Sequence, residues 1–195
     1  MERISEVERK TKETAIFTKL NLDGSGKAEI STGIPFFDHM LTLFTVHGFF
    51  DLKIDAKGDL DVDFHHTVED VGIVLGDTLA KALGDRKGII RYGHAVTPMD
   101  ETLTEVTVDL SNRPFLAYNY PESKEQGGGF TIQLAGEFFR ALSNRAGMNL
   151  HINVTYGENS HHIIESVFKS LGRSLDRAVS IDSRIKGVRS SKGYI

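Results

Sequence analysis

Two stretches of this sequence, 65–83 (HHTVEDVGIVLGDTLAKAL) and 161–179 (HHIIESVFKSLGRSLDRAV), align without a gap and decide the fold. They start 96 residues apart and share eight of nineteen positions, including both leading histidines and the following glutamate. A repeat of this length that occurs twice indicates a duplicated half-domain, because solenoid units run to roughly 20–50 residues. We therefore predict one domain over residues 1–195, with repeats of about 9–92 and 93–185 and a short C-terminal tail at 186–195.

Both stretches have the hydrophobic pattern of an amphipathic helix. Apolar residues recur at spacings of three and four from Val68 to Ala82 and from Ile164 to Ala178. Gly76 and Gly172 interrupt these patterns at equivalent positions, where glycine weakens a helix. We expect them to permit close packing of each helix on a sheet.

Upstream of each helix, the sequence predicts the same succession of elements. Each half has two expected strands, a helix and a third strand before the repeated helix, which gives the order strand–strand–helix–strand–helix. This order predicts an α+β fold with sheets covered by helices. The expected strands are Thr14–Leu22, Lys27–Ser31, Phe49–Ala56, Leu103–Leu110, Pro114–Tyr118 and Met148–Thr155, and the expected helices are Phe36–Val46 and Phe130–Ala146.

Composition excludes several classes of protein. The net charge of −4 argues against binding to a nucleic-acid backbone, which requires a basic surface. The absence of cysteine excludes disulfides and thiolate chemistry. The charged N-terminus lacks the apolar run of a signal peptide, and no stretch approaches a membrane span. We expect a cytoplasmic protein with no nucleic-acid or membrane partner.

Histidine carries the strongest chemical signal, since four of the eight histidines lie in the two His-His pairs. On a helix, Glu69 shares a face with both His65 and His66. Consecutive histidines diverge by about 100°, so they cannot easily bind the same ion. We therefore predict two metal ions, each bound by one histidine from each pair and a carboxylate. An isolated His-x-x-x-Glu is ordinarily a surface pair, but its repetition favours metal binding.

Two residues outside the aligned stretches 65–83 and 161–179 are further candidate ligands. His39 opens the first predicted helix, and its neighbour Asp38 could orient a ligand imidazole. The alternative is that Asp38 caps the helix and His39 is merely polar. Glu137 precedes its His-His pair by 24 residues, against 26 for His39, so pseudo-symmetry makes Glu137 a candidate too. The remaining histidines lack such spacing and are expected to be structural; they are His47, His94 and His151.

Segments distributed over the chain resemble the imidazoleglycerol-phosphate dehydratase family. They run in family order from near residue 9 to the end: STGIPFFDHML, DFHHTVEDVGI, GHAVTPMDE, LSNRP, ENSHHIIESVFK and the terminal SSKG. The resemblance implies a lyase of histidine biosynthesis that eliminates water from D-erythro-imidazoleglycerol phosphate to give imidazoleacetol phosphate. It also implies two Mn²⁺ ions per active site and a homo-oligomer of 24 subunits with sites between subunits.

Site residues follow from the resemblance position by position. The implied metal ligands are His39, His65, His66, Glu69, His161, His162 and Glu165, with Glu137 where some relatives carry a ligand histidine. The implied phosphate anchors are Arg91, Arg113, Lys169, Ser191 and Lys192, which composition alone would make scattered surface groups. Glu13 matches a carboxylate proposed for proton transfer, and Glu165 is the second candidate base.

The implied mechanism passes through metal-bound imidazolate. The ions would stabilise the substrate ring as an anion, from which the hydroxyl is expelled to give a neutral diazafulvene-like intermediate. Ligand preference alone would suit zinc or iron as readily as manganese, so manganese comes from the resemblance. Two other classes also use His/Glu clusters: a dinuclear metallohydrolase, and a metal-storage or structural module without catalysis.

Overall fold

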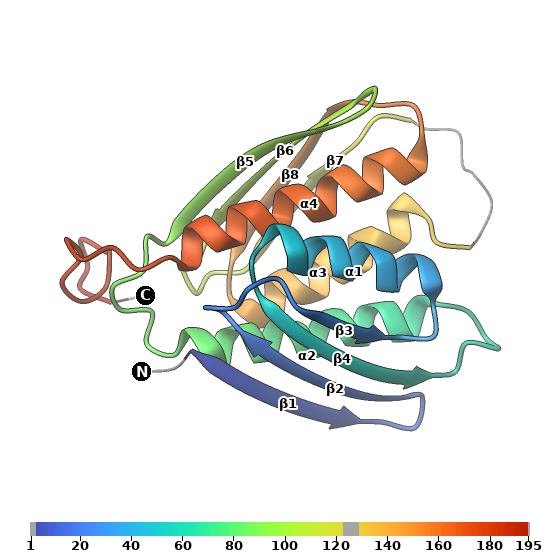
Figure 1. Ribbon diagram of the computed structural model, residues 1–195, viewed down its shortest axis with the longest axis horizontal. Coiled ribbons are helices and arrows are strands. Elements are labelled where there is room, and N and C mark those ends of the chain that lie inside the picture. The colour runs from blue at the N-terminus through green and yellow to red at the C-terminus, as the bar shows by residue number, and fades with distance from the viewer. Residues whose placement is uncertain (1–2, 123–128, 195) are drawn as a thin grey trace.

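The computed structural model describes residues 3–122 and 129–194 of the chain (Figure 1). In chain order its elements are β1 (Ile4–Lys10), β2 (Thr14–Asn21), β3 (Ala28–Ser31), α1 (Pro35–His47), β4 (Asp51–Gly58), α2 (His65–Leu83), β5 (Tyr92–Met99), β6 (Thr102–Asp109), β7 (Phe115–Asn119), α3 (Ile132–Ala146), β8 (Asn149–Tyr156) and α4 (Ser160–Val179).

The two halves have the same topology. The first sheet has the order β1-β2-β4-β3 and the second the order β5-β6-β8-β7. In each, one pairing is parallel, β3 with β4 and β7 with β8, and the connection runs through a helix, as parallel neighbours require. The α+β class and the order strand–strand–helix–strand–helix are confirmed. Each half begins with one further strand, β1 or β5, that the sequence analysis did not include.

The four helices lie between the two sheets (Figure 1). Helix α2 packs on the first sheet and α4 on the second, while α1 packs on α4 and α2 on α3. Both halves therefore contribute to one core. Its centre is aromatic, with Phe138 placed between Phe37 and Phe168 at ring-centroid distances of 5.3 and 5.4 Å.

The expected role of the two repeat glycines is wrong in one respect. A Cβ atom at Gly172 would lie 2.4 Å from the Phe44 carbonyl oxygen of α1, and one at Gly76 would lie 2.6 Å from the Arg145 Cβ of α3. The glycines permit close packing of helix on helix, not of helix on sheet. The pairing α1·α4 matters for function because it joins the two halves near the repeated histidines.

Strand residues alternate between the core and the solvent. In β2 the inward residues include Ile16 and Leu20, and in β6 they include Val106 and Val108, all nearly inaccessible. Val106, Val108 and Leu110 are all fully buried, so the expected strand Leu103–Leu110 turns one face to the core. Over the described ranges, no helix combines the length and apolar character needed to cross a bilayer.

Helices α2 and α4 begin at the same end of the molecule, whereas both chain termini lie at the other end (Figure 1). The His-His pairs thus share one end, because they occupy the first turns of α2 and α4. The opposite end of α4 meets the residues before β5, where the Arg91 backbone N–H donates to the Ala178 carbonyl at 2.8 Å. The His-His pairs and the region around Arg91 therefore lie at opposite ends of α4.

Candidate active site

The first of these regions is a cluster of His39, His161 and Glu165, contributed by α1 and α4. Their ligand atoms all lie within 4.8 Å of one another, with Glu165 Oε2 3.0 Å from His161 Nε2 and 3.5 Å from His39 Nε2. Donors bound to one transition-metal ion at about 2.0–2.2 Å lie roughly 3–4 Å apart. Two imidazole nitrogens and a carboxylate oxygen in this arrangement fit such an ion.

The second oxygen of Glu165 is held by a cation. Lys169 Nζ, four residues further along α4, lies 2.6 Å from Glu165 Oε1. Burial opposes ionisation of Glu165, but hydrogen bonding and charge from Lys169 and His161 outweigh it and lower the pKa of the carboxyl below its ordinary value. The site therefore presents an ionised carboxylate, whose Oε2 faces the two imidazoles.

A related arrangement lies at the start of α2. His65 Nε2 is 3.7 Å from Glu69 Oε2, and His65 lines a cavity of about 340 Å³ together with Glu137 of α3. Glu137 and His65 thus line the same cavity, but among the described residues their ligand atoms do not form a close group like that of His39, His161 and Glu165. Glu137 Oε2 is also 3.5 Å from Arg140 Nε.

The second histidine of each pair contacts a loop carboxylate. His66 Nδ1 lies 3.0 Å from Asp59 Oδ2, and His162 Nδ1 lies 2.7 Å from Glu101 Oε2. The expectation that Asp38 orients an imidazole is wrong: its Oδ1 accepts from the Thr32 backbone N–H at 2.8 Å and from the Thr32 hydroxyl at 2.6 Å. Asp38 therefore ties the first turn of α1 to the preceding loop.

These contacts do not unite the two His-His pairs within one chain. Among residues 3–122 and 129–194, the group of three or more candidate ligands contains His161 with His39, and no member of the first pair. The prediction of one histidine from each pair is thus not met within a single subunit. The two halves instead meet in the observed cluster, because His39 belongs to the first half and His161 to the second.

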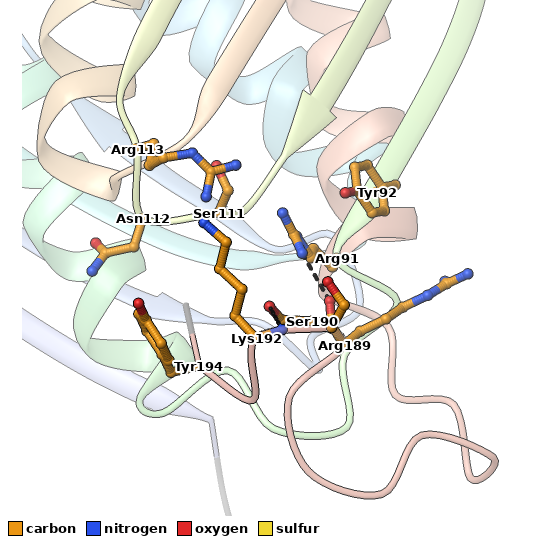
Figure 2. Close-up of a pocket in the computed structure, with 10 residues that line it drawn as sticks. Arg91, Tyr92, Ser111, Asn112, Arg113, Arg189, Ser190, Lys192 and Tyr194 are labelled. Atoms are coloured by element: carbon orange, nitrogen blue, oxygen red, sulfur yellow. Dashed lines mark hydrogen bonds between the residues drawn. The ribbon is translucent and has the colours of Figure 1, made fainter.

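The second region is a cationic pocket of about 960 Å³ at the far end of α4 (Figure 2). Four of the five expected phosphate anchors line it, namely Arg91, Arg113, Ser191 and Lys192, together with Tyr92, Ser111, Asn112, Arg189, Ser190 and Tyr194. In Figure 2 the Lys192 amine points towards Arg113, whereas the Arg189 side chain points away from it. The fifth expected anchor, Lys169, lies outside this pocket, beside Glu165.

The two arginines among the expected anchors differ in how many partners their side chains have. Arg91 is buried; it forms a two-point ion pair with Asp109 at 2.6 and 3.0 Å and donates to the Arg189 carbonyl at 2.8 Å. The Asp109 carboxylate raises the pKa of Arg91 further. Arg113 is exposed, and its contact with the same carboxylate is longer, at 3.9 Å. Arg91 thus holds the pocket and the tail together, and Arg113 offers a guanidinium to a ligand.

Backbone strain also gathers at this pocket. Arg91 and Asn112 have φ angles of 76° and 56°, in the left-handed region that costs L-residues roughly 1–2 kcal/mol. Such strain persists where the surrounding contacts impose it, and it is frequent at ligand sites. Among the described residues, two of the five non-glycine residues with a positive φ thus line this pocket.

Glu13 lies in the turn between β1 and β2, near the first His-His pair. Its backbone N–H donates to the Thr11 hydroxyl at 3.1 Å. Its charge contributes to the raised pKa of His66, after the larger effect of the Asp59 hydrogen bond. No hydrogen bond or ion pair joins the Glu13 carboxylate to another described residue, whereas both oxygens of Glu165 have partners. Glu13 is thus the freer of the two candidate bases.

Sequence reasoning missed several residues of these regions. Asp59 and Glu101 contact ligand candidates from loops outside the repeated helices, and Asn112 and Tyr194 line the pocket. Glu101 stands in the GHAVTPMDE segment, which received no role, and Asp59 opens an acidic run before His65. These are the signals that could have suggested them.

A duplicated α+β core with an imidazole–carboxylate cluster at one end and a cationic pocket at the other defines a protein with a candidate metal site and a separate candidate anion site. The family model described as imidazoleglycerol-phosphate dehydratase matches residues 32–175. The chain therefore belongs to the imidazoleglycerol-phosphate dehydratase family.

Individual relatives agree with this assignment. The chain is 62% identical to the imidazoleglycerol-phosphate dehydratase of Desulfosudis oleivorans and 55% identical to that of Geobacter sulfurreducens, each over the full length of both proteins. The crystal structure of the Staphylococcus aureus enzyme matches with a TM-score of 0.82 and 41% identity, covering 92% of this chain and 99% of that one. The enzyme from Pyrococcus furiosus, in complex with (S)-C348, matches with a TM-score of 0.85 and 39% identity, covering 97% and 100%.

The activity is thus that of a hydro-lyase of histidine biosynthesis, which dehydrates imidazoleglycerol phosphate. The expected family, function and enzyme class are confirmed. The family assignment speaks against the two alternatives, a metallohydrolase and a storage or structural module without catalysis.

Proposed function

We propose that this dehydratase works with two Mn²⁺ ions per active site, and that each site is shared between subunits. The observation that supports a shared site is the distance between the His/Glu cluster and the cationic pocket. His161 and Ala178 are 17 residues apart on α4, which at 1.5 Å per residue places the pocket about 25 Å from the cluster. The substrate has about five bonds between the ring and the phosphorus atom, so it spans less than about 10 Å.

If the cluster binds the ring and the pocket binds the phosphate, one subunit would not hold both ends of one substrate molecule. A neighbouring subunit that placed its cationic pocket beside this subunit's His/Glu cluster would complete the site. The same arrangement would bring His66 or His162 of one chain to the open positions of a cluster in another. We accordingly propose a homo-oligomer, of 24 subunits as the family resemblance implies, located in the cytoplasm.

The residues present divide the work of the reaction. His39, His161 and Glu165 would hold one ion, and His65, Glu69 and Glu137 would contribute to the other, with His66 and His162 as the remaining ligands. The ions would supply Lewis acidity, which stabilises negative charge on the substrate imidazole. The pocket residues Arg91, Arg113, Ser191 and Lys192 would fix the phosphate and so the position of the reacting carbon.

Glu13 is the proposed base. It would take the proton from the carbon next to the one that bears the leaving hydroxyl. Loss of hydroxide and of that proton yields an enol, which tautomerises to the ketone of imidazoleacetol phosphate. Glu165 suits this step less well, because its oxygens are committed to Lys169 and to the two imidazoles.

The test is product analysis on metal-stripped protein reconstituted with Mn²⁺, Zn²⁺ or Mg²⁺. We expect imidazoleacetol phosphate, with no release of inorganic phosphate, and the highest rate with Mn²⁺. His65→Ala and His162→Ala should each reduce bound metal and abolish turnover. His94→Ala is the matched control, because His94 contacts Glu105 on the exposed face of the second sheet. Full activity and metal content in either of the first two variants would contradict the shared site.

A further inference from the structure

The two histidines of each pair differ in which ring nitrogen faces a carboxylate. His65 and His161 turn Nε2 towards the glutamate four residues later. His66 and His162 instead turn Nδ1 towards a carboxylate from another part of the chain, at 3.0 and 2.7 Å. The same difference occurs in both halves, although Asp59 follows β4 and Glu101 lies in the β5–β6 turn. Two loops at different places in the topology thus each bring a carboxylate to the Nδ1 atom of a histidine.

Glu101 is itself held in place. Its Oε1 accepts the backbone N–H groups of Glu158 and Asn159, which immediately precede α4, at 3.3 and 2.9 Å. Together with His162, these hydrogen bonds lower the pKa of Glu101 to about 2. The neighbouring Asp100 has a φ of 48°, a left-handed conformation at the turn that presents Glu101. The remaining oxygen, Oε2, faces His162.

The contact determines which ring nitrogen carries hydrogen. A neutral imidazole has one N–H and one lone pair, and an ionised carboxylate can only accept a hydrogen bond. Facing a carboxylate, Nδ1 keeps its hydrogen and Nε2 keeps its lone pair. Nε2 of His162 lies 3.8 Å from Asp100 Oδ2, too far for a hydrogen bond. The free lone pair is the form that a metal ion requires.

We propose that Glu101 and Asp59 are positioning residues that fix the ring orientation and the Nδ1–H tautomer of His162 and His66, so that Nε2 is the metal-binding atom. This inference rests on the proposed metal site and adds to it the two groups that prepare its second histidines. Neither carboxylate fills the core, since the side chains of Asp59 and Glu101 are 28% and 37% exposed.

The variant that tests the proposal is Glu101→Gln. The two backbone N–H groups before α4 need an acceptor, so they select the amide oxygen of the new side chain. The amide NH₂ then faces His162, where it donates to Nδ1 and favours hydrogen on Nε2. The variant keeps the shape of the residue and inverts the tautomer, instead of merely deleting a contact.

We expect Glu101→Gln to weaken Mn²⁺ binding about 10–100-fold, the usual effect of losing a partner of a ligand histidine. Affinity would be measured by competition with a chelator on the full-length protein. Imidazole ¹⁵N shifts of the metal-free, histidine-labelled protein should move His162 from Nδ1–H to Nε2–H, with the signal assigned by its loss in His162→Ala. Asp59→Asn, in the other half, tests His66 in the same way.

Glu105→Gln is the matched control, because it alters a histidine–carboxylate contact of 3.0 Å that engages Nε2 of His94 instead. It should leave Mn²⁺ affinity unchanged. Unchanged affinity in Glu101→Gln, or weaker binding with His162 still in the Nδ1–H form, would overturn the tautomer proposal. His162→Ala distinguishes failure of the tautomer proposal from failure of the proposed metal site. If this variant retains full metal content, His162 is not a ligand and the proposed metal site itself is wrong.

Discussion

At the scale of single residues, Glu165 is subject to two opposed influences. Burial disfavours its charge, while Lys169 at 2.6 Å and His161 favour it, and the net effect is a lowered pKa. A group of this kind stabilises the folded protein above its unfolded pKa, and that contribution is lost as the pH falls through the lowered folded value. Lys169 thus keeps the Glu165 carboxylate ionised, and available to a cation, to a lower pH than burial alone would allow.

Lys169→Met should raise the pKa of Glu165, because burial would then act with less opposition. We expect Mn²⁺ occupancy, measured at fixed free metal over about pH 4–8, to be lost at a higher pH than in the unchanged protein. Arg173→Met is the control, since it removes a cation one turn further along α4 that binds the Val96 carbonyl. Identical occupancy curves for Lys169→Met and the unchanged protein would show that Lys169 does not maintain this carboxylate.

At the residue level, the sequence was most informative where a pattern was repeated. The two HHxxE segments identified both His-His pairs, and most of the expected anchors share one pocket. Asp59 and Glu101 were missed because their contacts arise from turns that meet the helices only in three dimensions. No spacing in the sequence encodes them.

At the scale of elements, the position of α1 on α4 brings His39 to His161 and Glu165. The axes approach closely because Gly172 has no side chain at the contact with the Phe44 carbonyl. Gly172→Ala should therefore destabilise the fold by about 1–3 kcal/mol, although alanine favours a helix. Thermal or urea unfolding would measure the loss.

A second glycine provides the comparison for that experiment. At Gly136 an added Cβ would lie 3.2 Å from the edge of the Tyr118 ring, a side chain that can shift, and not 2.4 Å from backbone. We expect Gly136→Ala to cost less than Gly172→Ala. Gly172→Ala should also weaken Mn²⁺ binding, because it separates the helices that carry the ligands. Equal stability in the two variants would contradict this account.

The tail is an element whose role can be separated from folding. Arg189 connects it to the body, through its carbonyl to Arg91 and its guanidinium to the Ile90 carbonyl. Deleting residues 190–195 preserves both contacts and removes Ser191 and Lys192 from the pocket. We expect an unchanged melting temperature and a KM raised at least about 10-fold, since uniform phosphate binding is lost. An unchanged KM would mean that the tail is only a frayed end.

Sequence patterns located most elements well, and the exceptions have a common cause. The repeated helices were expected at 65–83 and 161–179 and are observed at His65–Leu83 and Ser160–Val179. β1 was missed because its residues ISEVERK are largely charged or polar, and β5 because YGHAVTPM contains glycine and proline. Both are strands whose pairing with a neighbour outweighs weak local preference.

At the scale of the whole molecule, metal binding and assembly should be linked. If ligands to one ion come from more than one chain, the free energy of binding contributes to the subunit interface. A chelator should therefore break the oligomer into smaller folded particles, and mild acid should do the same by protonating free imidazoles. Mn²⁺ added at neutral pH should restore mass and activity together. Light scattering showing an undiminished particle, with metal removal confirmed by elemental analysis, would place the sites within single subunits.

The separation of the cluster and the pocket along α4 also has a genetic consequence. Two alleles, one carrying His161→Ala and the other Arg113→Ala, would each encode a defective enzyme. In a cell that expresses both, some sites would combine an intact cluster from one product with an intact pocket from the other. With equal expression and random mixing about a quarter of the sites would be restored, so the two mutations should complement each other for growth without histidine. A single-subunit site would allow no such rescue, and the paired alleles would remain histidine auxotrophs.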